Sequence, residues 1–101
     1  MDRFQEMRVL LAVTEAESFA GGAKLLGISP PSVTRAVAAL EARLGTLLLA
    51  RSTRSLRLTE AGQRYVEDCR RILLELEEAE ELVILVKGTG NATFQSTLKL
   101  A

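Results

Sequence analysis

The sequence predicts a mainly α-helical fold, in which three short helices and a two-stranded hairpin precede one long helix. Apolar residues recur at intervals of three and four in the helical segments, as they do on the buried side of an amphipathic helix. An alternating segment interrupts that pattern between residues 46 and 58, and no proline occurs after it. A chain of 101 residues is long enough for one small domain with a thin core, which a partner subunit can reinforce.

The first helix is expected from Arg3 to about Ala16, because Asp2 can cap the free amide groups of its first turn. Its apolar spacing predicts a single buried stripe. That stripe is expected to contain Phe4, Met7, Leu10, Leu11 and Thr14.

The second helix is expected from a Ser18 cap through about Leu26, with Phe19 and Ala23 on its inner side. The adjacent glycines at 21 and 22 lower its intrinsic helix propensity. Their small size predicts that another helix packs closely against this segment.

The third helix follows a tight turn at Gly27, with Ser29 as its cap, and runs to about Leu44. Proline is tolerated in the first turn of a helix, but the residue before a proline avoids helical angles, so we expect the helix to begin at Pro31 rather than Pro30. Two helices joined by a short glycine-containing turn are typical of a helix-turn-helix, here about residues 18–44. Its core stripe is expected to be Val33, Val37, Leu40 and Leu44.

Two short strands with a polar, arginine-bearing tip are expected at about residues 46–58, where Leu56 and Leu58 alternate with polar residues. Such a hairpin after a helix-turn-helix is a wing. Residues 1–58 are therefore predicted to form a winged helix-turn-helix domain.

A long linker helix is predicted over residues 59–87, with Thr59 as its cap. A 3.5-residue apolar repeat along it is typical of a coiled coil, so we expect a homodimer, with a higher oligomer also compatible. Cys69 lies on this seam and is interpreted as a small buried hydrophobe rather than a redox sensor. The full predicted seam is Tyr65, Cys69, Ile72, Leu76, Ala79, Val83 and Val86. Residues 88–101 are interpreted as a tail that begins a missing further domain.

The composition argues against several functional classes. The chain has no histidine and one cysteine, so it lacks an ordinary acid-base pair, an internal disulfide and a cysteine or histidine metal site. We therefore predict neither an enzyme nor a bound metal or cofactor. No run of 18 uncharged apolar residues occurs and the N-terminus carries an early acid, which predicts a cytoplasmic protein without a membrane partner.

Positive charge is concentrated in one part of a chain whose formal net charge is zero. Residues 33–58 hold five arginines and a single acid, Glu41. A stretch of this kind favours a polyanionic partner, and in a helix-turn-helix that partner is double-stranded DNA.

The first turns of the third helix would carry the residues that read DNA, because this end of a recognition helix enters the major groove. Arginine can bind guanine, hydroxyl groups can bind bases or phosphates, and methyl groups can contact thymine. The alternative for Arg35 is a solvated side chain or an ion pair on the side of the helix that bears Glu41. The candidate major-groove residues are Pro31, Ser32, Thr34 and Arg35.

The wing supplies a second set of candidates near the phosphate backbone, namely Arg51, Ser52 and Arg54, with Arg54 favoured for a narrow minor groove. The alternative is that these are ordinary exposed loop residues. Arg43 and Arg57 are weaker candidates.

Residues 18–69, "SFAGGAKLLGISPPSVTRAVAALEARLGTLLLARSTRSLRLTEAGQRYVEDC", closely resemble the winged helix-turn-helix domain of LysR-type transcriptional regulators. The resemblance covers about residues 2–87 and rests on the order of features, including Ser18-Phe19, Leu40-Glu41 and Leu58-Thr59 with Ala61-Gly62. Two positions depart from the usual pattern. Pro30 stands where glutamine is common, and Gly22 stands where alanine is usual.

The resemblance implies a DNA-binding regulator whose linker helices pair antiparallel in a dimer on an interrupted inverted repeat. It assigns DNA contacts to the same α-helical turn and to Arg51 and Arg54. Family members continue into an effector-binding domain, of which only "STLKLA" resembles a part, so we expect a fragment or a truncated regulator and predict no small-molecule effector for this chain. The rival interpretations are a coiled-coil protein interaction module and a winged-helix regulator of another family.

Overall fold

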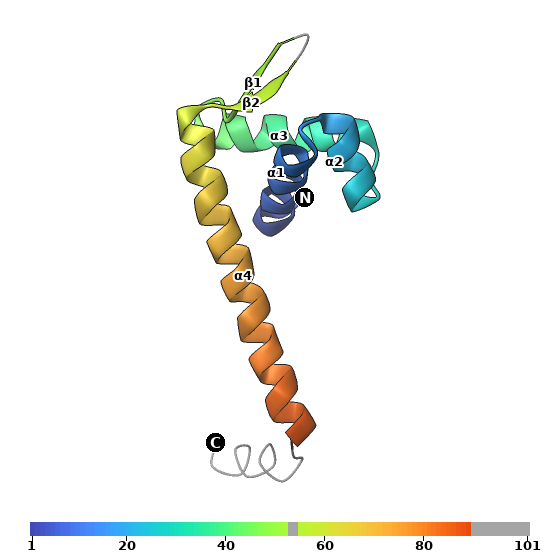
Figure 1. Ribbon diagram of the computed structural model, residues 1–101, viewed down its shortest axis with the longest axis vertical. Helices are drawn as coiled ribbons and strands as arrows, with labels where there is room; N and C mark the ends of the chain where they lie inside the picture. Colours follow the sequence, from blue (N-terminus) through green and yellow to red (C-terminus); the bar gives the residue numbers. More distant parts are fainter. Residues whose placement is uncertain (53–54, 90–101) are drawn as a thin grey trace. The chain divides into compact units, whose positions relative to one another are not determined.

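Four helices and a two-stranded sheet follow one another in the computed structural model, which describes residues 1–52 and 55–89 (Figure 1). The helices are α1 (Arg3–Ala16), α2 (Phe19–Leu26), α3 (Pro30–Leu44) and α4 (Glu60–Thr89), and the strands are β1 (Leu49–Arg51) and β2 (Leu56–Leu58). The chain divides into two units, residues 1–70 and the remainder, and α4 runs from the first into the second. Four helices with a two-stranded wing match the predicted mainly α-helical fold.

The helix ends follow the predicted capping chemistry. Asp2 accepts a 2.8 Å hydrogen bond from the Gln5 amide, and the Gln5 side-chain oxygen accepts one from the Asp2 amide at 3.0 Å, which completes a capping box. Ser18 and Ser29 cap α2 and α3 in the same way. The structure corrects one boundary, since Pro30 already occupies the first position of α3. The fixed φ of proline suits this position, and its missing N–H has no intrahelical acceptor there.

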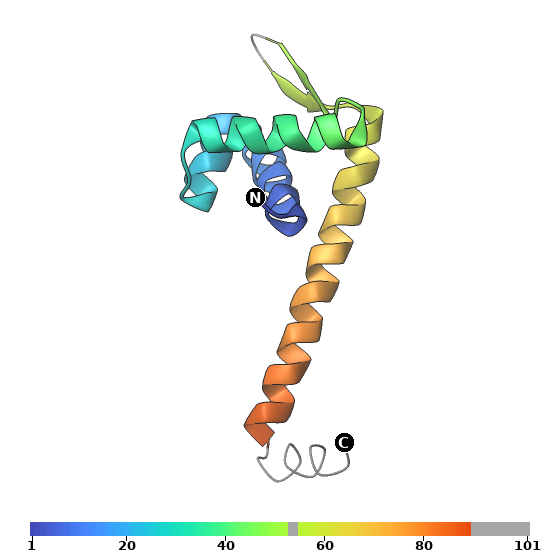
Figure 2. The ribbon, with the colours of Figure 1, turned by 180° about the vertical axis from the view of Figure 1, so that it is seen from behind.

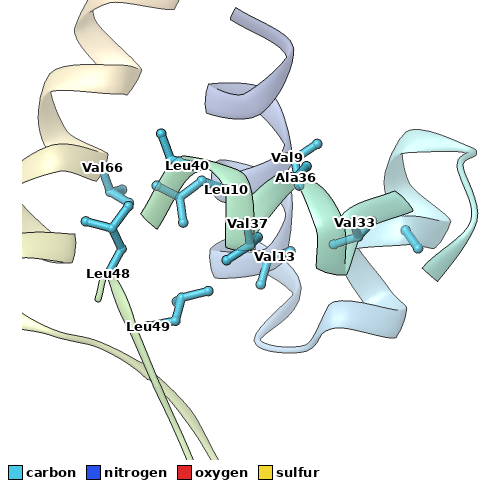
Figure 3. Close-up of a cluster of buried hydrophobic side chains, with 11 residues drawn as sticks. Val9, Leu10, Val13, Val33, Ala36, Val37, Leu40, Leu48, Leu49 and Val66 are labelled. Carbon is cyan, nitrogen blue, oxygen red and sulfur yellow. The ribbon is translucent and has the colours of Figure 1, made fainter. Parts of the chain in front are cut away.

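The hydrophobic core of the first unit is formed mainly by α1 and α3 together with the base of the wing and the start of α4 (Figure 3). Leu10, Leu40 and Leu48 are fully buried in it, and Val66 brings α4 onto the same cluster. On α3 the predicted stripe is buried except for Leu44, which is 40% exposed.

The predicted stripe on α1 was wrong in part. Its buried side chains are Glu6, Val9, Leu10, Ala12 and Val13. Phe4 is 41% exposed, while Met7 and Thr14 are only partly buried. The apolar residues of this helix surround more than one face, so spacing alone did not determine which face packs inward.

Close packing of α2 against α1 depends on the two glycines, as predicted. A β-carbon on Gly22 would lie 2.8 Å from Cγ2 of Val13 and 3.0 Å from its backbone, and one on Gly21 would lie 2.7 Å from Cβ of Ala16. Side chains at these positions would push the helices apart.

The wing is a short antiparallel hairpin in which Leu49 pairs with Leu58 and Arg51 with Leu56. Thr59 connects it to α4: its amide donates to the Leu48 carbonyl at 2.9 Å, its hydroxyl donates to the Leu47 carbonyl at 2.7 Å, and the hydroxyl accepts from the Gly62 amide at 3.0 Å. Thr59 is therefore the predicted cap of α4 and also its tie to the base of the wing.

In the second unit, α4 continues to Thr89, two residues beyond the predicted end. Its last turns carry five consecutive apolar residues that are all at least half exposed: Leu82, Val83, Ile84, Leu85 and Val86. The expectation for a tail falls mostly on residues 90–101, outside the described part of the chain. Within the described part, no helix is both long and apolar enough to span a bilayer.

Candidate nucleic-acid interface

The N-terminal turns of α3 present an exposed group of side chains. Pro31, Thr34 and Arg35 are exposed, and Ser32 is partly buried. The Ser32 and Ser29 hydroxyl oxygens lie 2.7 Å apart, so these two hydroxyls share a hydrogen bond. Thr34 donates its hydroxyl proton to the Pro30 carbonyl at 3.2 Å, which leaves the Thr34 oxygen as an acceptor toward an outside donor.

Arg35 makes no ion pair or hydrogen bond with any other described residue, so its guanidinium keeps its donors for an external group. The alternative of an ion pair toward Glu41 is not formed, and Glu41 has other partners. Its carboxylate accepts the backbone amides of Leu48 and Leu49 at 2.7 and 3.2 Å. Glu41 thus connects the recognition helix directly to the base of the wing.

The wing projects beyond the level of α3, whereas α1 lies on the other side of that helix (Figures 1 and 2). Arg51 ends β1 and is exposed, and its guanidinium carbon lies 4.1 Å from the centre of the Phe19 ring at the start of α2. This is a cation–π contact, worth about 0.5–1 kcal/mol at exposed sites. Arg51 is therefore held against the helix-turn-helix.

Ser52 has a role inside the hairpin. Its backbone amide donates to the Ser55 carbonyl at 2.9 Å, and its hydroxyl accepts the Ser55 amide at 3.0 Å. These bonds close the loop across its tip. Arg54, predicted to enter the minor groove, lies with Thr53 outside the described residues.

Arg43 has a structural partner. It forms a 2.6 Å ion pair with Glu6, which is 8% exposed, and so joins α3 to α1. The hydrogen bond that Arg43 donates to the Glu6 carboxylate raises the pKa of Arg43 above its ordinary value. Burial raises the pKa of both Tyr65 and Cys69 next to this pair, so the Cys69 thiol stays protonated and unreactive at neutral pH.

Three features thus follow one another in the chain. The first turns of the capped helix α3 are exposed, the wing is anchored beside that helix, and the long helix α4 follows the wing. The sequence profile of "Bacterial regulatory helix-turn-helix protein, lysR family" matches residues 4–63, which is more than half of the chain. The chain belongs to the LysR family. Its first unit is a LysR-type winged helix-turn-helix DNA-binding domain.

Two named relatives are transcriptional regulators. The regulator TcbR of Pseudomonas sp. (strain P51) is 49% identical over 70 residues, which are 69% of this chain and 24% of that protein. The activator AaeR of Escherichia coli (strain K12) is 39% identical over 95 residues, which are 94% of this chain and 31% of that protein. The chain thus spans about a quarter to a third of the length of these curated relatives.

Among solved structures, the CbnR DNA-binding domain in a complex with DNA superposes with a TM-score of 0.79 at 40% identity. The match covers 86% of this LysR-family chain and 99% of that one. Because the first unit is 70 residues long, this coverage means that the match extends into the second unit.

Sequence reasoning missed three residues that organise this LysR-type interface. All three belong to the motif that carries the family resemblance, but the sequence did not predict that Glu41 would hold the base of the wing, that Phe19 would contact Arg51, or that Gly62 would lie against the Leu48 carbonyl. A β-carbon on Gly62 would lie 2.0 Å from the Leu48 carbonyl oxygen, so only glycine allows α4 to begin so close to the wing. The signal for Gly62 was its position in the first turn of a helix, where glycine is otherwise unfavourable.

Proposed function

We propose that this chain binds double-stranded DNA sequence-specifically as a dimer on an interrupted inverted repeat, in a regulatory rather than a catalytic role. The observation that supports this most directly is the exposed N-terminal end of α3, where Arg35 has no partner among the described residues. In helix-turn-helix proteins this end of the second helix enters the major groove. In the proposed complex, the wings lie on flanking minor grooves, where Arg54 is the candidate contact.

Each residue of the α3 turn has a distinct part in this proposal. Arg35 binds a guanine edge through two donors, and Thr34 accepts a hydrogen bond from a base amine or places its methyl against thymine. Pro31 offers only carbon and reads a thymine methyl. Ser32 lies closer to the helix and is assigned to a phosphate, because part of its hydrogen-bonding capacity is used by Ser29.

The test begins with selection of bound duplexes from a random pool, followed by affinity measurements on the selected site and on scrambled DNA. Arg35→Ala should weaken binding to the selected site by about 1–3 kcal/mol and relax the preference at one base position. Arg70→Ala removes an exposed arginine from α4 and serves as the charge-matched control, with no expected change in preference. Equal losses on all duplexes for Arg35→Ala would refute base reading.

A salt titration separates this proposal from a protein interaction module. Binding through phosphate contacts releases counterions, so affinity should fall steeply as salt increases. An interaction module with incidental arginines predicts no duplex binding at any salt concentration.

We also propose that a second copy of the chain pairs with the linker part of α4. The support is the exposed apolar surface of its last turns, where Val83 is 69% and Val86 51% exposed. Cys69 is 0% exposed within its own chain, and Tyr65 packs against the hydrophobic core of that chain, so these two positions are already used by the chain's own fold. The pairing surface is therefore assigned to Ile72, Leu76, Ala79, Val83 and Val86.

Replacing Ile72 and Leu76 together by aspartate should yield monomers in sedimentation experiments, because two charges cannot be buried between paired helices. Leu74→Asp is the matched control, since Leu74 is 55% exposed and lies off the proposed seam. Dimers that persist in the double variant would reject this surface.

A further inference from the structure

We propose that Phe19 is a positioning residue for DNA binding, whose ring holds the Arg51 guanidinium in place for a backbone phosphate. This inference rests on the proposed function, because it concerns how one contact of the DNA interface is prepared. It gives a residue of the helix-turn-helix core a part in binding, although Phe19 itself touches no DNA.

The geometry places the two side chains in direct contact across two elements. The guanidinium carbon of Arg51 lies 4.1 Å from the ring centre of Phe19, well inside the range of cation–π contacts. Phe19 is partly buried and packs against the hydrophobic core, so its ring is fixed from behind. Arg51 is exposed at the end of β1. The fixed ring therefore limits where a long, mobile side chain can lie.

The chemistry of the contact suits an anion-binding arginine. A ring face attracts the cation without neutralising it, whereas a carboxylate would cancel its charge. Among the described residues, no carboxylate pairs with Arg51 and no hydrogen bond to its side chain occurs. A guanidinium stacked by its face keeps its N–H donors along its edge, where they can bind the two oxygens of a phosphate.

Fixing the side chain before binding also has an energetic consequence. An unrestrained arginine loses rotamer freedom when it contacts DNA, and an arginine already held by a ring loses less. The wing needs such support because each of its strands has only three residues, and an isolated two-stranded hairpin is marginally stable. Phe19 thus connects a small two-stranded element to the helical part of the domain.

The proposal is tested with Phe19→Leu, Phe19→Tyr, Arg51→Ala and the double variant Phe19→Leu/Arg51→Ala in the full chain. Affinity for the selected duplex is measured across a salt series, and thermal unfolding without DNA checks the fold. Arg51→Ala should weaken binding to all sequences alike and reduce the slope of log affinity against log salt by about 0.9. Phe19→Leu should weaken binding by about two- to tenfold, and Phe19→Tyr should bind as the wild type does.

The double variant distinguishes positioning from general stability. If Phe19 acts through Arg51, Phe19→Leu should have no further effect on affinity when Arg51 is already alanine. An equal loss in both backgrounds, or an unchanged affinity in Arg51→Ala, would overturn the inference while duplex binding by the wild type still supports the proposed function. If Phe19→Leu does not fold, Arg51→Lys decides. It keeps the charge but stacks less well, so wild-type affinity would overturn the inference and a two- to tenfold loss would support it.

Discussion

Gly62→Ala should destabilise this domain strongly, although alanine is the better helix former. The added β-carbon would lie 2.0 Å from the Leu48 carbonyl oxygen, 2.9 Å from its carbon and 3.1 Å from Cδ2 of Leu58. A side chain could rotate away, but the closest atom belongs to the backbone. That carbonyl also accepts the Thr59 amide at 2.9 Å, so it cannot move without breaking the connection between wing and α4.

The magnitude follows from three contributions. Overpacking of a filled site costs about 1–3 kcal/mol. Loss of one hydrogen bond at the Thr59 connection costs about 1 kcal/mol more. The intrinsic preference of a helix for alanine returns at most about 1 kcal/mol. The net loss is therefore about 1–3 kcal/mol, which lowers the melting temperature of a domain of this size by roughly 4–8 °C per kcal/mol.

The assay is thermal or urea unfolding followed by circular dichroism, with Gly88→Ala as the matched control. Gly88 also lies in α4, but nothing lies within 4 Å of the position that its β-carbon would take. Gly88→Ala should therefore be neutral or slightly stabilising. If Gly62→Ala were as stable as the wild type, the close approach of α4 to the wing would be refuted.

Three further predictions concern single side chains. Glu41→Gln should lower DNA affinity, because a neutral amide oxygen accepts hydrogen bonds from the Leu48 and Leu49 amides less strongly than a carboxylate does. The base of the wing would then be held less firmly. Unchanged affinity and stability would contradict this role. Glu17→Gly should stabilise the fold by up to about 1 kcal/mol in urea unfolding, because Glu17 has a φ of 57°, whereas Glu17→Ala keeps the strain and should show no gain. Burial raises the pKa of Cys69 and Tyr65, so the folded state binds their protons more tightly than the unfolded state does. The free energy of unfolding should therefore stay level at neutral pH and fall above about pH 8.5, where the unfolded thiol begins to lose its proton. Cys69→Ala should remove the first part of that fall.

The helix boundaries could be predicted from the sequence because they depend on local chemistry. Asp2, Ser18 and Ser29 each satisfy an amide three residues ahead, and Gly27 and Gly45 adopt the left-handed conformation that ends α2 and α3. Such contacts need no knowledge of the rest of the fold. The exposure of Pro31, Thr34 and Arg35 on α3 was also predictable, because these positions lie off a clear buried stripe.

Contacts between distant elements could not be predicted in this way. On α4, the 3.5-residue repeat was assigned mostly to a partner chain, but its first two positions pack within the chain itself: Cys69 is fully buried and Tyr65 lies against the hydrophobic core. Both kinds of packing require apolar residues at the same spacing, so periodicity does not distinguish a partner from the chain's own core. The roles of Glu41 and Phe19 likewise depend on residues seven to 32 positions away, whose proximity only the fold determines.

Of the four described arginines in the basic stretch of residues 33–58, one holds two helices together and three remain exposed. Arg43 is neutralised by Glu6, and Glu41, the only acid of the stretch, is occupied by two backbone amides. Arg35, Arg51 and Arg57 are exposed and have no acidic partner among the described residues. The only acid within the stretch, Glu41, bonds to backbone amides and does not neutralise these three arginines. The local positive charge therefore favours a polyanionic partner even though the formal net charge of the chain is zero.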